Sequence, residues 1–354
     1  MAENSKIEWT HHTFNPWMGC TKVSPACKNC YAEREFDHHY GKVSWGPNGT
    51  RVLTSEAYWK KPLKWNREAE SSGIRARVFC ASLADVFEDW DGPILNSKGE
   101  RLWIDTASAA WLFASKEDSE RSELARQKGV AAGTMNDVRK RLFALIDATP
   151  NLDWLLLTKR PENIEKMWPA IGFPESGVTG TLGRHLHLAN VWLGTSVENQ
   201  EYADKRIPEL LKCRDLSPVL FLSCEPLLGP VDLQNIQVAA EGGGLGPDQL
   251  SDDLYDALEG EVCSGETGCV TREGQPTVDW VIAGGESGPE ARPTDPEWVR
   301  SLRDQCQAAG VPFLFKQWGE CDENSQRVGK SRAGRMLDGV LHDEFPKKRL
   351  EAFK

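Results

Sequence analysis

The sequence of 354 residues has no long hydrophobic run. None of its apolar stretches approaches the roughly 20 residues that a membrane-spanning helix requires. Its first residues do not combine positive charge with an apolar segment, as a secretory signal would. We therefore expect a cytoplasmic protein with no membrane partner, in which the ten cysteines are thiols or metal ligands and not disulfides.

The chain also lacks the excess of positive charge that is typical of nucleic-acid-binding proteins, because its formal net charge is −11. Eight carboxylates account for most of this charge, and they lie in one stretch without Lys or Arg. They are Glu241, Asp248, Asp252, Asp253, Asp256, Glu259, Glu261 and Glu266. The rest of the chain is close to balanced, so the net charge does not exclude a nucleic-acid partner.

Three cysteines lie within eleven residues near the start of the chain. Six residues separate Cys20 from Cys27, and two separate Cys27 from Cys30. A Cys-x-x-Cys pair brings two thiolates to one metal centre, and Cys20 joins them if the loop containing Pro25 folds back. Three thiolates are one short of a closed zinc site, and they leave one iron of a cubane iron–sulfur cluster without a protein ligand. The pattern favours an open cluster, with a closed zinc site or no metal as alternatives.

Other segments accompany this cysteine motif over nearly the whole chain. They are residues 7–10, 15–16, 19–33, 156–161, 190–198, 222–230, 279–289 and 315–319. Together they resemble the phage-associated "three-Cys-motif" family, which is of unknown function and is grouped with the radical S-adenosylmethionine (SAM) enzymes. Two details differ from the commonest radical SAM motif: the first gap is six residues instead of three, and Asn29 instead of an aromatic residue precedes Cys30.

The resemblance implies a [4Fe-4S] cluster held by Cys20, Cys27 and Cys30, with SAM bound at the open iron. In such enzymes the reduced cluster passes one electron to the sulfonium, which releases methionine and a 5′-deoxyadenosyl radical that takes hydrogen from a substrate. An electron donor of flavodoxin or ferredoxin type is then required. The substrate is not identified, a nucleic acid is one candidate, and the location implied is the cytoplasm of a bacterial or phage-infected host cell.

The alternative function belongs to another class. The same cysteines would serve a zinc- or iron–sulfur-stabilised nucleic-acid-binding or interaction protein without catalysis. Such a protein would contain zinc and be colourless, or would be brown and leave SAM intact.

Short apolar runs alternate with helical patterns along the chain. After a first short strand within 1–19, strands are predicted at 77–83, 152–157, 191–194, 219–222, 278–283 and 312–315. Helices are predicted at 31–36, 134–148, 162–168, 199–212 and 296–309. Such alternation is typical of a parallel sheet with helices outside. It predicts an α/β fold, a full or partial (β/α) TIM-like barrel of six to seven parallel strands.

The predicted barrel domain covers residues 1–320. An excursion at 91–132 and an acidic loop insert at 240–277 interrupt it, and a polar tail at 321–354, expected to be partly ordered at best, follows. Five residues separate Cys263 from Cys269 in the insert. Two cysteines are too few for a metal site, so we expect them to be solvated loop thiols.

Polar residues follow several of the predicted strands. In (β/α) barrels the chemistry lies at the carboxyl ends of the strands. The expected cofactor site is therefore lined by Ser82, Asp85, Lys159, Arg160, Ser196, Glu198, Glu225, Gly284, Gly285, Glu286 and Ser287. The alternative for each is a helix-capping role. No catalytic residue is assigned.

Within this set, Gly284-Gly285-Glu286 has its own physical argument. Two glycines after a buried strand permit close approach of the backbone to a ligand, and the carboxylate can accept hydrogen bonds from an ammonium or hydroxyl group. We expect Glu286 to contact SAM or substrate. The alternative is a tight turn in which Glu286 caps a helix.

Residues 51–77 mix basic and aromatic side chains, which favours a surface for nucleic acid. The alternative is an amphipathic helix with a solvated face. The fourteen tryptophans allow a similar pair of interpretations, either core packing or stacking on bases or a cofactor.

Overall fold

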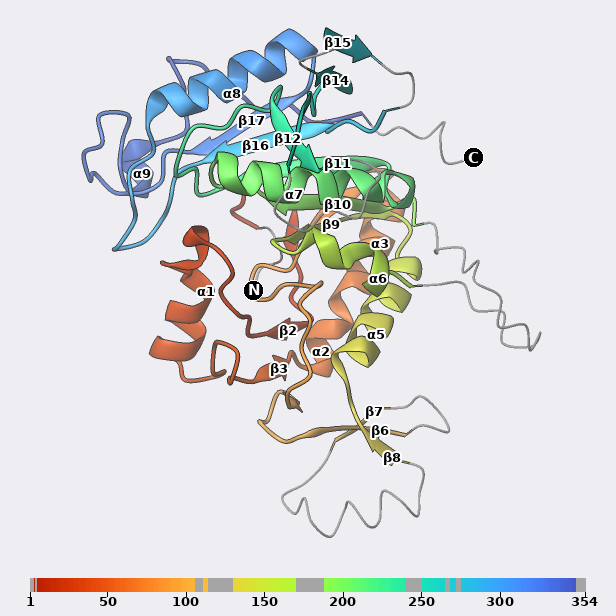
Figure 1. Cartoon of the computed structure of the whole chain (residues 1–354). Helices are drawn as coiled ribbons and strands as arrows, with labels where there is room; N and C mark the ends of the chain where they lie inside the picture. Colours follow the sequence, from red (N-terminus) through yellow and green to blue (C-terminus); the bar gives the residue numbers. More distant parts are fainter. Residues whose placement is uncertain are drawn as a thin grey trace, which may run out of the picture. The chain divides into compact units, whose positions relative to one another are not determined.

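The structure is a computed structural model, and it describes residues 3, 5–105, 111–113, 130–169, 188–239, 250–264, 268–271 and 275–347 (Figure 1). The chain forms two compact units. Unit 1 comprises Met1–Val23, Cys30–Trp154 and Pro169–Gly183, and unit 2 comprises Ser24–Asn29, Leu155–Trp168 and Arg184–Lys354. The middle of the cysteine loop therefore belongs to a different unit from its two ends.

The largest sheet in the described part of the chain has seven strands, in the order β1-β4-β9-β10-β11-β16-β17. They are β1 (His12–Thr13), β4 (Ala76–Cys80), β9 (Leu152–Thr158), β10 (Val191–Ser196), β11 (Val219–Cys224), β16 (Trp280–Gly284) and β17 (Phe313–Gln317). β1 pairs with β4, β10 with β11, β11 with β16, and β16 with β17, all in parallel. The edge strands are β1 and β17, so the sheet is open. The predicted α/β class is confirmed, and this sheet is consistent with a partial (β/α) barrel.

Burial explains why these strands were visible in the sequence. Every residue of β10, β11 and β16 is buried. Parallel strands covered on both faces read as continuous apolar runs, without the alternation of a half-exposed strand. Nine of the fourteen tryptophans are buried as well, which supports the core-packing interpretation for them: Trp9, Trp17, Trp59, Trp65, Trp154, Trp168, Trp192, Trp280 and Trp318.

Three of the described long helices begin at a residue whose side chain caps the helix. The described helices are α1 (Tyr31–Glu33), α2 (Glu56–Trp59), α3 (Lys61–Ser72), α5 (Met135–Asp147), α6 (Ile164–Met167), α7 (Gln200–Lys212), α8 (Pro296–Ala309) and α9 (Lys330–Ala333). Thr134 and Asp137 form a capping box at the start of α5. Asn199 caps α7, and Asp295 caps α8, which ends at Gly310 with a φ of 67°. The three long helices predicted from periodicity are confirmed. No described helix has the length and apolar character needed to cross a membrane.

Two three-stranded sheets belong to unit 1. One contains β2 (Trp17–Met18), β3 (Arg51–Leu53) and β5 (Ile94–Leu95), and the other contains β6 (Leu102–Asp105), β7 (Trp111–Phe113) and β8 (Val130–Ala132). The second sheet lies within the predicted excursion at 91–132. Residues 106–110 and 114–129 of that excursion lie outside the described residues.

The acidic insert of unit 2 and the residues just before it form a sheet that the sequence did not predict. β12 (Ile236–Ala239), β13 (Leu250–Tyr255), β14 (Glu261–Ser264) and β15 (Gly268–Thr271) form an antiparallel sheet. Cys263 is disulfide-bonded, and the register places Cys269 opposite it. The prediction that the insert cysteines are thiols is therefore wrong for Cys263, because strand pairing, which the polar sequence concealed, brings the two positions together. Residues 240–249, 265–267 and 272–274 lie outside the described residues.

The segment after residue 320 packs on the last strands of unit 2. Phe315 N donates to His342 O (3.0 Å), and Trp280 Nε1 donates to Glu344 O (2.9 Å). Trp318 Nε1 donates to a carbonyl in the same segment, which is described to residue 347. The domain boundary expected at 320 stays a prediction.

Candidate metal and ligand site

The Cys20 end of the cysteine loop is held in unit 1 by backbone bonds. Gly19 N donates to Leu83 O (3.1 Å), and Cys20 O accepts a hydrogen bond from Gly46 N (3.0 Å). Gly19 has a φ of 108°, and a Cβ at this position would lie 2.5 Å from Thr50 O. Only glycine fits there, so the backbone conformation at the start of the loop is fixed.

A buried ion pair supports the residue after Cys20. Arg51 donates from Nε and Nη2 to the two oxygens of Glu88, each at 2.7 Å, and the two side chains are 0% and 2% exposed. Glu88 Oε1 also accepts from Thr21 N (2.8 Å), and Arg51 Nη2 donates to Thr21 Oγ1 (2.9 Å). The guanidinium lies 3.8 Å from the centre of the Trp90 ring. This network fixes the backbone next to Cys20.

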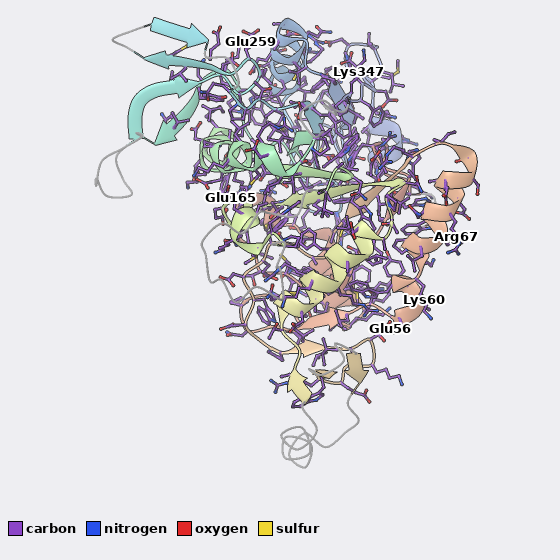
Figure 2. All side chains as sticks on the ribbon, turned by 90° about the vertical axis from the view of Figure 1, so that its right-hand side faces the viewer. Glu56, Lys60, Arg67, Glu165, Glu259 and Lys347 are labelled. Carbon is purple, nitrogen blue, oxygen red and sulfur yellow. The ribbon has the colours of Figure 1, made fainter. Side chains whose placement is uncertain are left out.

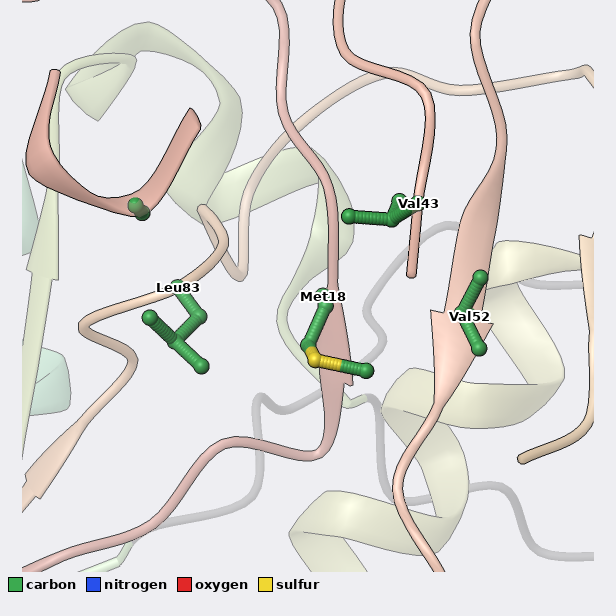
Figure 3. Close-up of a cluster of buried hydrophobic side chains, with 5 residues drawn as sticks. Met18, Val43, Val52 and Leu83 are labelled. Carbon is green, nitrogen blue, oxygen red and sulfur yellow. The ribbon is translucent and has the colours of Figure 1, made fainter. Parts of the chain in front are cut away.

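Cys30, also in unit 1, packs against a small hydrophobic cluster. The cluster consists of Met18, Ala32, Val43, Val52 and Leu83 (Figure 3). Cys30 and Phe36 pack against it and remain partly exposed. Helix α1 follows, and a π-helix (η2, Arg34–His39) continues it. The predicted helix after the loop is confirmed, with π-helical pairing, which is frequent near functional sites, in its second part.

The middle of the loop is attached to the segment after β16 in unit 2. Asn29 Nδ2 donates to Glu286 Oε2 (3.1 Å) and to Glu290 O (2.7 Å). Arg292 Nη1 donates to Pro25 O (3.1 Å). The chain is therefore held on both sides of the central cysteine.

Glu286 is the centre of this attachment. Arg292 donates from Nε and from its backbone N to Oε2, each at 2.8 Å, and from Nη2 to Oε1 at 2.6 Å. Burial alone would raise the pKa of Glu286, but the hydrogen bonds from Arg292 and Asn29 outweigh burial and lower this pKa below its usual value. Glu286 thus binds the cysteine loop as a carboxylate, and a direct contact with a ligand stays a prediction.

Further polar side chains gather where the strands of unit 2 end. Lys159 Nζ donates to Ser196 Oγ (2.9 Å). Ser223 Oγ donates to Glu225 Oε2 (3.3 Å), and Lys316 Nζ lies 2.9 Å from Glu225 Oε1. Because parallel strands end at the same edge of a sheet, these side chains share one edge.

Besides Glu225 Oε1, which is ion-paired with Lys316, two buried acceptors at this edge have no hydrogen-bond partner among the described residues. They are Glu198 Oε1 and Gln317 Oε1. Glu198 is fully buried, and its other oxygen accepts from Arg206 Nη1 (2.8 Å). Gln317 is 5% exposed, and its Nε2 donates to Ser287 Oγ (2.8 Å). A buried acceptor without a donor costs about 1–3 kcal/mol, so a ligand that brings a donor to either oxygen would be stabilised.

Packing within unit 2 restricts the two glycines at the end of β16, and most strictly Gly285, which faces backbone. A Cβ on Gly284 would lie 2.7 Å from Glu225 Oε1, and a Cβ on Gly285 would lie 1.9 Å from Trp318 O. The close approach that we predicted for a ligand is made by protein atoms. A ligand contact at these glycines stays a prediction.

The remaining predicted site residues have local roles in this structure. In unit 1, Asn15 Nδ2 donates to Ser82 Oγ (3.1 Å), and Asp85 Oδ1 accepts from Phe87 N (3.0 Å) as in an Asx turn. In unit 2, Arg160 is 8% exposed. Cofactor binding by these three residues stays a prediction.

Sequence reasoning missed the residues that hold the loop: Arg51, Glu88 and Arg292. They are 31, 68 and 272 positions from Cys20, and no periodicity connects them to the cysteines. Asn29 did carry a signal, because it stands where an aromatic residue is commonest in the radical SAM motif. The departure is visible in the sequence, but its reason, the hydrogen bonds to Glu286 and Glu290, is visible only in the structure.

Five described cysteines outside the loop are buried, Cys321 among them, and burial raises the pKa of the following four thiols. They are Cys80, Cys213, Cys224 and Cys306. Because the thiolate is the metal ligand, these positions are poorer donors than the partly exposed loop cysteines. Among the described residues, no three His, Cys, Asp or Glu side chains already converge as a metal site. The metal assignment therefore rests on the donor type, spacing and exposure of the loop thiols.

The aromatic side chains of segment 51–77 are buried in unit 1. Tyr58, Trp59 and Trp65 are 7%, 3% and 1% exposed, whereas Lys60 and Arg67 are exposed on the outer side of α2 and α3 (Figure 2). The segment has a solvated basic face, and its rings are not available to stack on bases.

A comparison with protein families matches residues 4–128 and 129–346 to the family described as "Protein of unknown function (DUF5131)". The chain belongs to this family. The match confirms the expectation of an uncharacterised family, whereas the phage association and the similarity to radical SAM enzymes belong to the proposal below. No curated protein and no solved structure matches this DUF5131 chain.

Proposed function

We propose that this protein is an iron–sulfur enzyme of the radical SAM type, built on a partial (β/α) barrel and similar to the phage-associated proteins named above. Cys20, Cys27 and Cys30 would hold a [4Fe-4S] cluster with one open iron. One observation carries the proposal. Three partly exposed cysteines lie within eleven residues, whereas the described cysteines elsewhere are buried or, at Cys263, disulfide-bonded.

The carboxyl edge of unit 2 supports SAM as the second cofactor. SAM carries an ammonium group, a carboxylate and two ribose hydroxyls. Glu198 Oε1 and Gln317 Oε1 are buried acceptors for its donors, and Lys159 and Lys316 supply positive charge for its carboxylate. When bound, the two cofactors would supply a 5′-deoxyadenosyl radical, and the protein would orient them and exclude water.

Two partners follow from this proposal. An electron donor of flavodoxin or ferredoxin type would reduce the cluster. A nucleic acid is the substrate class for which the chain offers a charged surface, because Lys60, between α2 and α3, and Lys64 and Arg67, on α3, are exposed.

The test is anaerobic reconstitution with iron and sulfide, followed by reduction, addition of SAM and measurement of 5′-deoxyadenosine and methionine. We expect a brown protein with about four irons per chain that forms both products. Cys27→Ala should lose the cluster absorbance, whereas Cys213→Ala, which removes a buried thiol, should keep it.

Three other results would contradict the proposal, each in a different way. A colourless protein that contains zinc would support the zinc-stabilised binding module. A brown protein that leaves SAM intact would indicate an iron–sulfur protein without this catalysis. Full iron content in Cys27→Ala would reject the ligand assignment.

A further inference from the structure

Two side-chain hydrogen bonds attach the chain at points two residues away from Cys27 on either side. Arg292 Nη1 donates to Pro25 O (3.1 Å), and Asn29 Nδ2 donates to Glu286 Oε2 (3.1 Å). Glu286 also binds Arg292 through two parallel bonds, so the two attachment points are linked to each other. All of these residues belong to unit 2.

The attached segment is itself constrained. Pro25 begins a 3₁₀ turn (η1, Pro25–Cys27), and Cys27 N donates to Ser24 O (2.9 Å). The proline ring fixes one backbone angle of this turn, and Ala26 is buried. A short turn of this kind transmits the position of its ends to the thiol that it carries.

The other side of the attachment is also firmly held. The Glu286 side chain is 6% exposed, and Glu286 O accepts a hydrogen bond from Glu320 N (3.0 Å). A Cβ on Gly319 would lie 2.1 Å from the same carbonyl oxygen, so the two backbone segments are in close contact. These contacts fix the position of Cys27 relative to the ends of β16 and β17.

We propose that Asn29, Glu286 and Arg292 form a loop anchor that positions the Cys27 thiol for the metal centre. This inference rests on the proposed cluster. The three are positioning residues, because they act on the thiol through the backbone of the turn. The anchor also gives a physical reason for an amide at position 29, because its NH2 group donates to both Glu286 and Glu290, whereas Phe has no donor and Tyr or Trp has only one.

The first test measures Cys27 in the full-length, metal-free, reduced protein. Its alkylation by iodoacetamide is followed by peptide mass spectrometry. Asn29→Ala and Arg292→Ala should each raise the rate about tenfold, the change that one lost hydrogen bond makes in a local opening equilibrium. Arg300→Ala is the matched control, because it breaks another Arg–carboxylate pair of unit 2, with Asp338 at 2.7 Å, and should leave the rate unchanged.

The second test uses charge rescue. Asn29→Asp places a second carboxylate against Glu286 and should raise the rate further than Asn29→Ala. Adding Glu286→Gln removes the like-charge repulsion and supplies a donor, so the rate should fall back toward that of the wild type. In the reconstituted protein the reduction potential should shift in the same order, which a purely structural role does not predict.

Unchanged labelling in both alanine variants, or no rescue in the double variant, would overturn the anchor. If the wild type takes up no iron, the proposed function fails. The order of labelling rates, measured without metal, still decides whether the anchor controls Cys27.

Discussion

Two ion pairs support the cysteine loop, one in each unit, and they differ in their exposure to water. In unit 1, Arg51 and Glu88 are 0% and 2% exposed, whereas in unit 2, Arg292 and Glu286 are 29% and 6% exposed. Each carboxylate also accepts a hydrogen bond from the loop, Glu88 from Thr21 N and Glu286 from the Asn29 amide.

The difference in exposure separates two roles. A fully buried pair that loses one partner leaves an uncompensated charge in the interior, so it contributes mainly to whether the unit folds. A pair that water reaches on one side tolerates a change at a smaller cost in stability. Breaking the pair of unit 2 should therefore displace the loop while the protein stays folded.

The largest effect is expected from Glu88→Gln in unit 1. The change leaves the buried Arg51 guanidinium without its counter-charge, and we expect the free energy of unfolding to fall by about 3–5 kcal/mol. Denaturant unfolding monitored by circular dichroism measures it. The double variant Arg51→Met/Glu88→Leu removes both charges and should recover much of the loss. A loss below about 1 kcal/mol would show that the ion pair of unit 1 contributes no more to the free energy of unfolding than the ion pair of unit 2.

An intermediate effect is expected from Gly319→Ala, which changes the backbone under Glu286. Gly319 has a φ of 91°, and the new Cβ would collide with Glu286 O. We expect a loss of about 2–3 kcal/mol from strain and displacement together, with faster alkylation of Cys27. Gly329→Ala is the control for strain alone, because its φ is 87° and no atom lies within 4 Å of its Cβ position. Equal losses of unfolding free energy in the two variants would show that the close contact with Glu286 O contributes nothing beyond backbone strain.

The smallest effect is expected from Glu286→Gln. We expect a loss of about 1–2 kcal/mol at pH 7, because charge-assisted hydrogen bonds become neutral. The hydrogen bonds from Arg292 and Asn29 lower the pKa of Glu286 in the folded protein. The ionised form therefore contributes its stability at pH values above the pKa of this group in the unfolded chain, which is about 4.3. This contribution disappears as the pH falls through the folded pKa. Unfolding curves of wild type and variant should therefore approach each other in acid, and a constant gap from pH 7 to pH 3 would contradict this assignment.

The sheet and the long helices could be predicted because their signals are local. β10, β11 and β16 are continuous buried runs, and Thr134, Asn199 and Asp295 are helix caps that can be recognised from a few neighbours. The sheet β12–β15 was missed for the opposite reason. Its strands are four to six residues long, mix polar with apolar residues and pair with one another, so no continuous apolar run marked them in the sequence.

The attachment of the cysteine loop in unit 2 could be predicted from the sequence only at Glu286. Glu286 was selected as a carboxylate after two glycines, but its partner Arg292 and the amide of Asn29 were not connected with it. Arg51 and Glu88 lie 37 residues apart, and nothing in either neighbourhood indicates a buried pair. Ion pairs of this kind are set by tertiary packing, which a single sequence does not display.

The close fit of Gly285 against Trp318 O and of Gly319 against Glu286 O also bears on how the DUF5131 family can diverge. A descendant that lost all three loop cysteines would still need both glycines, because backbone atoms fill the space that any side chain would require. Gly285 and Gly319 would therefore persist in lineages without a metal centre. The residue at position 29 would distinguish family members that keep the metal centre from those that have lost it, because an amide is needed there only to hold the cysteine loop.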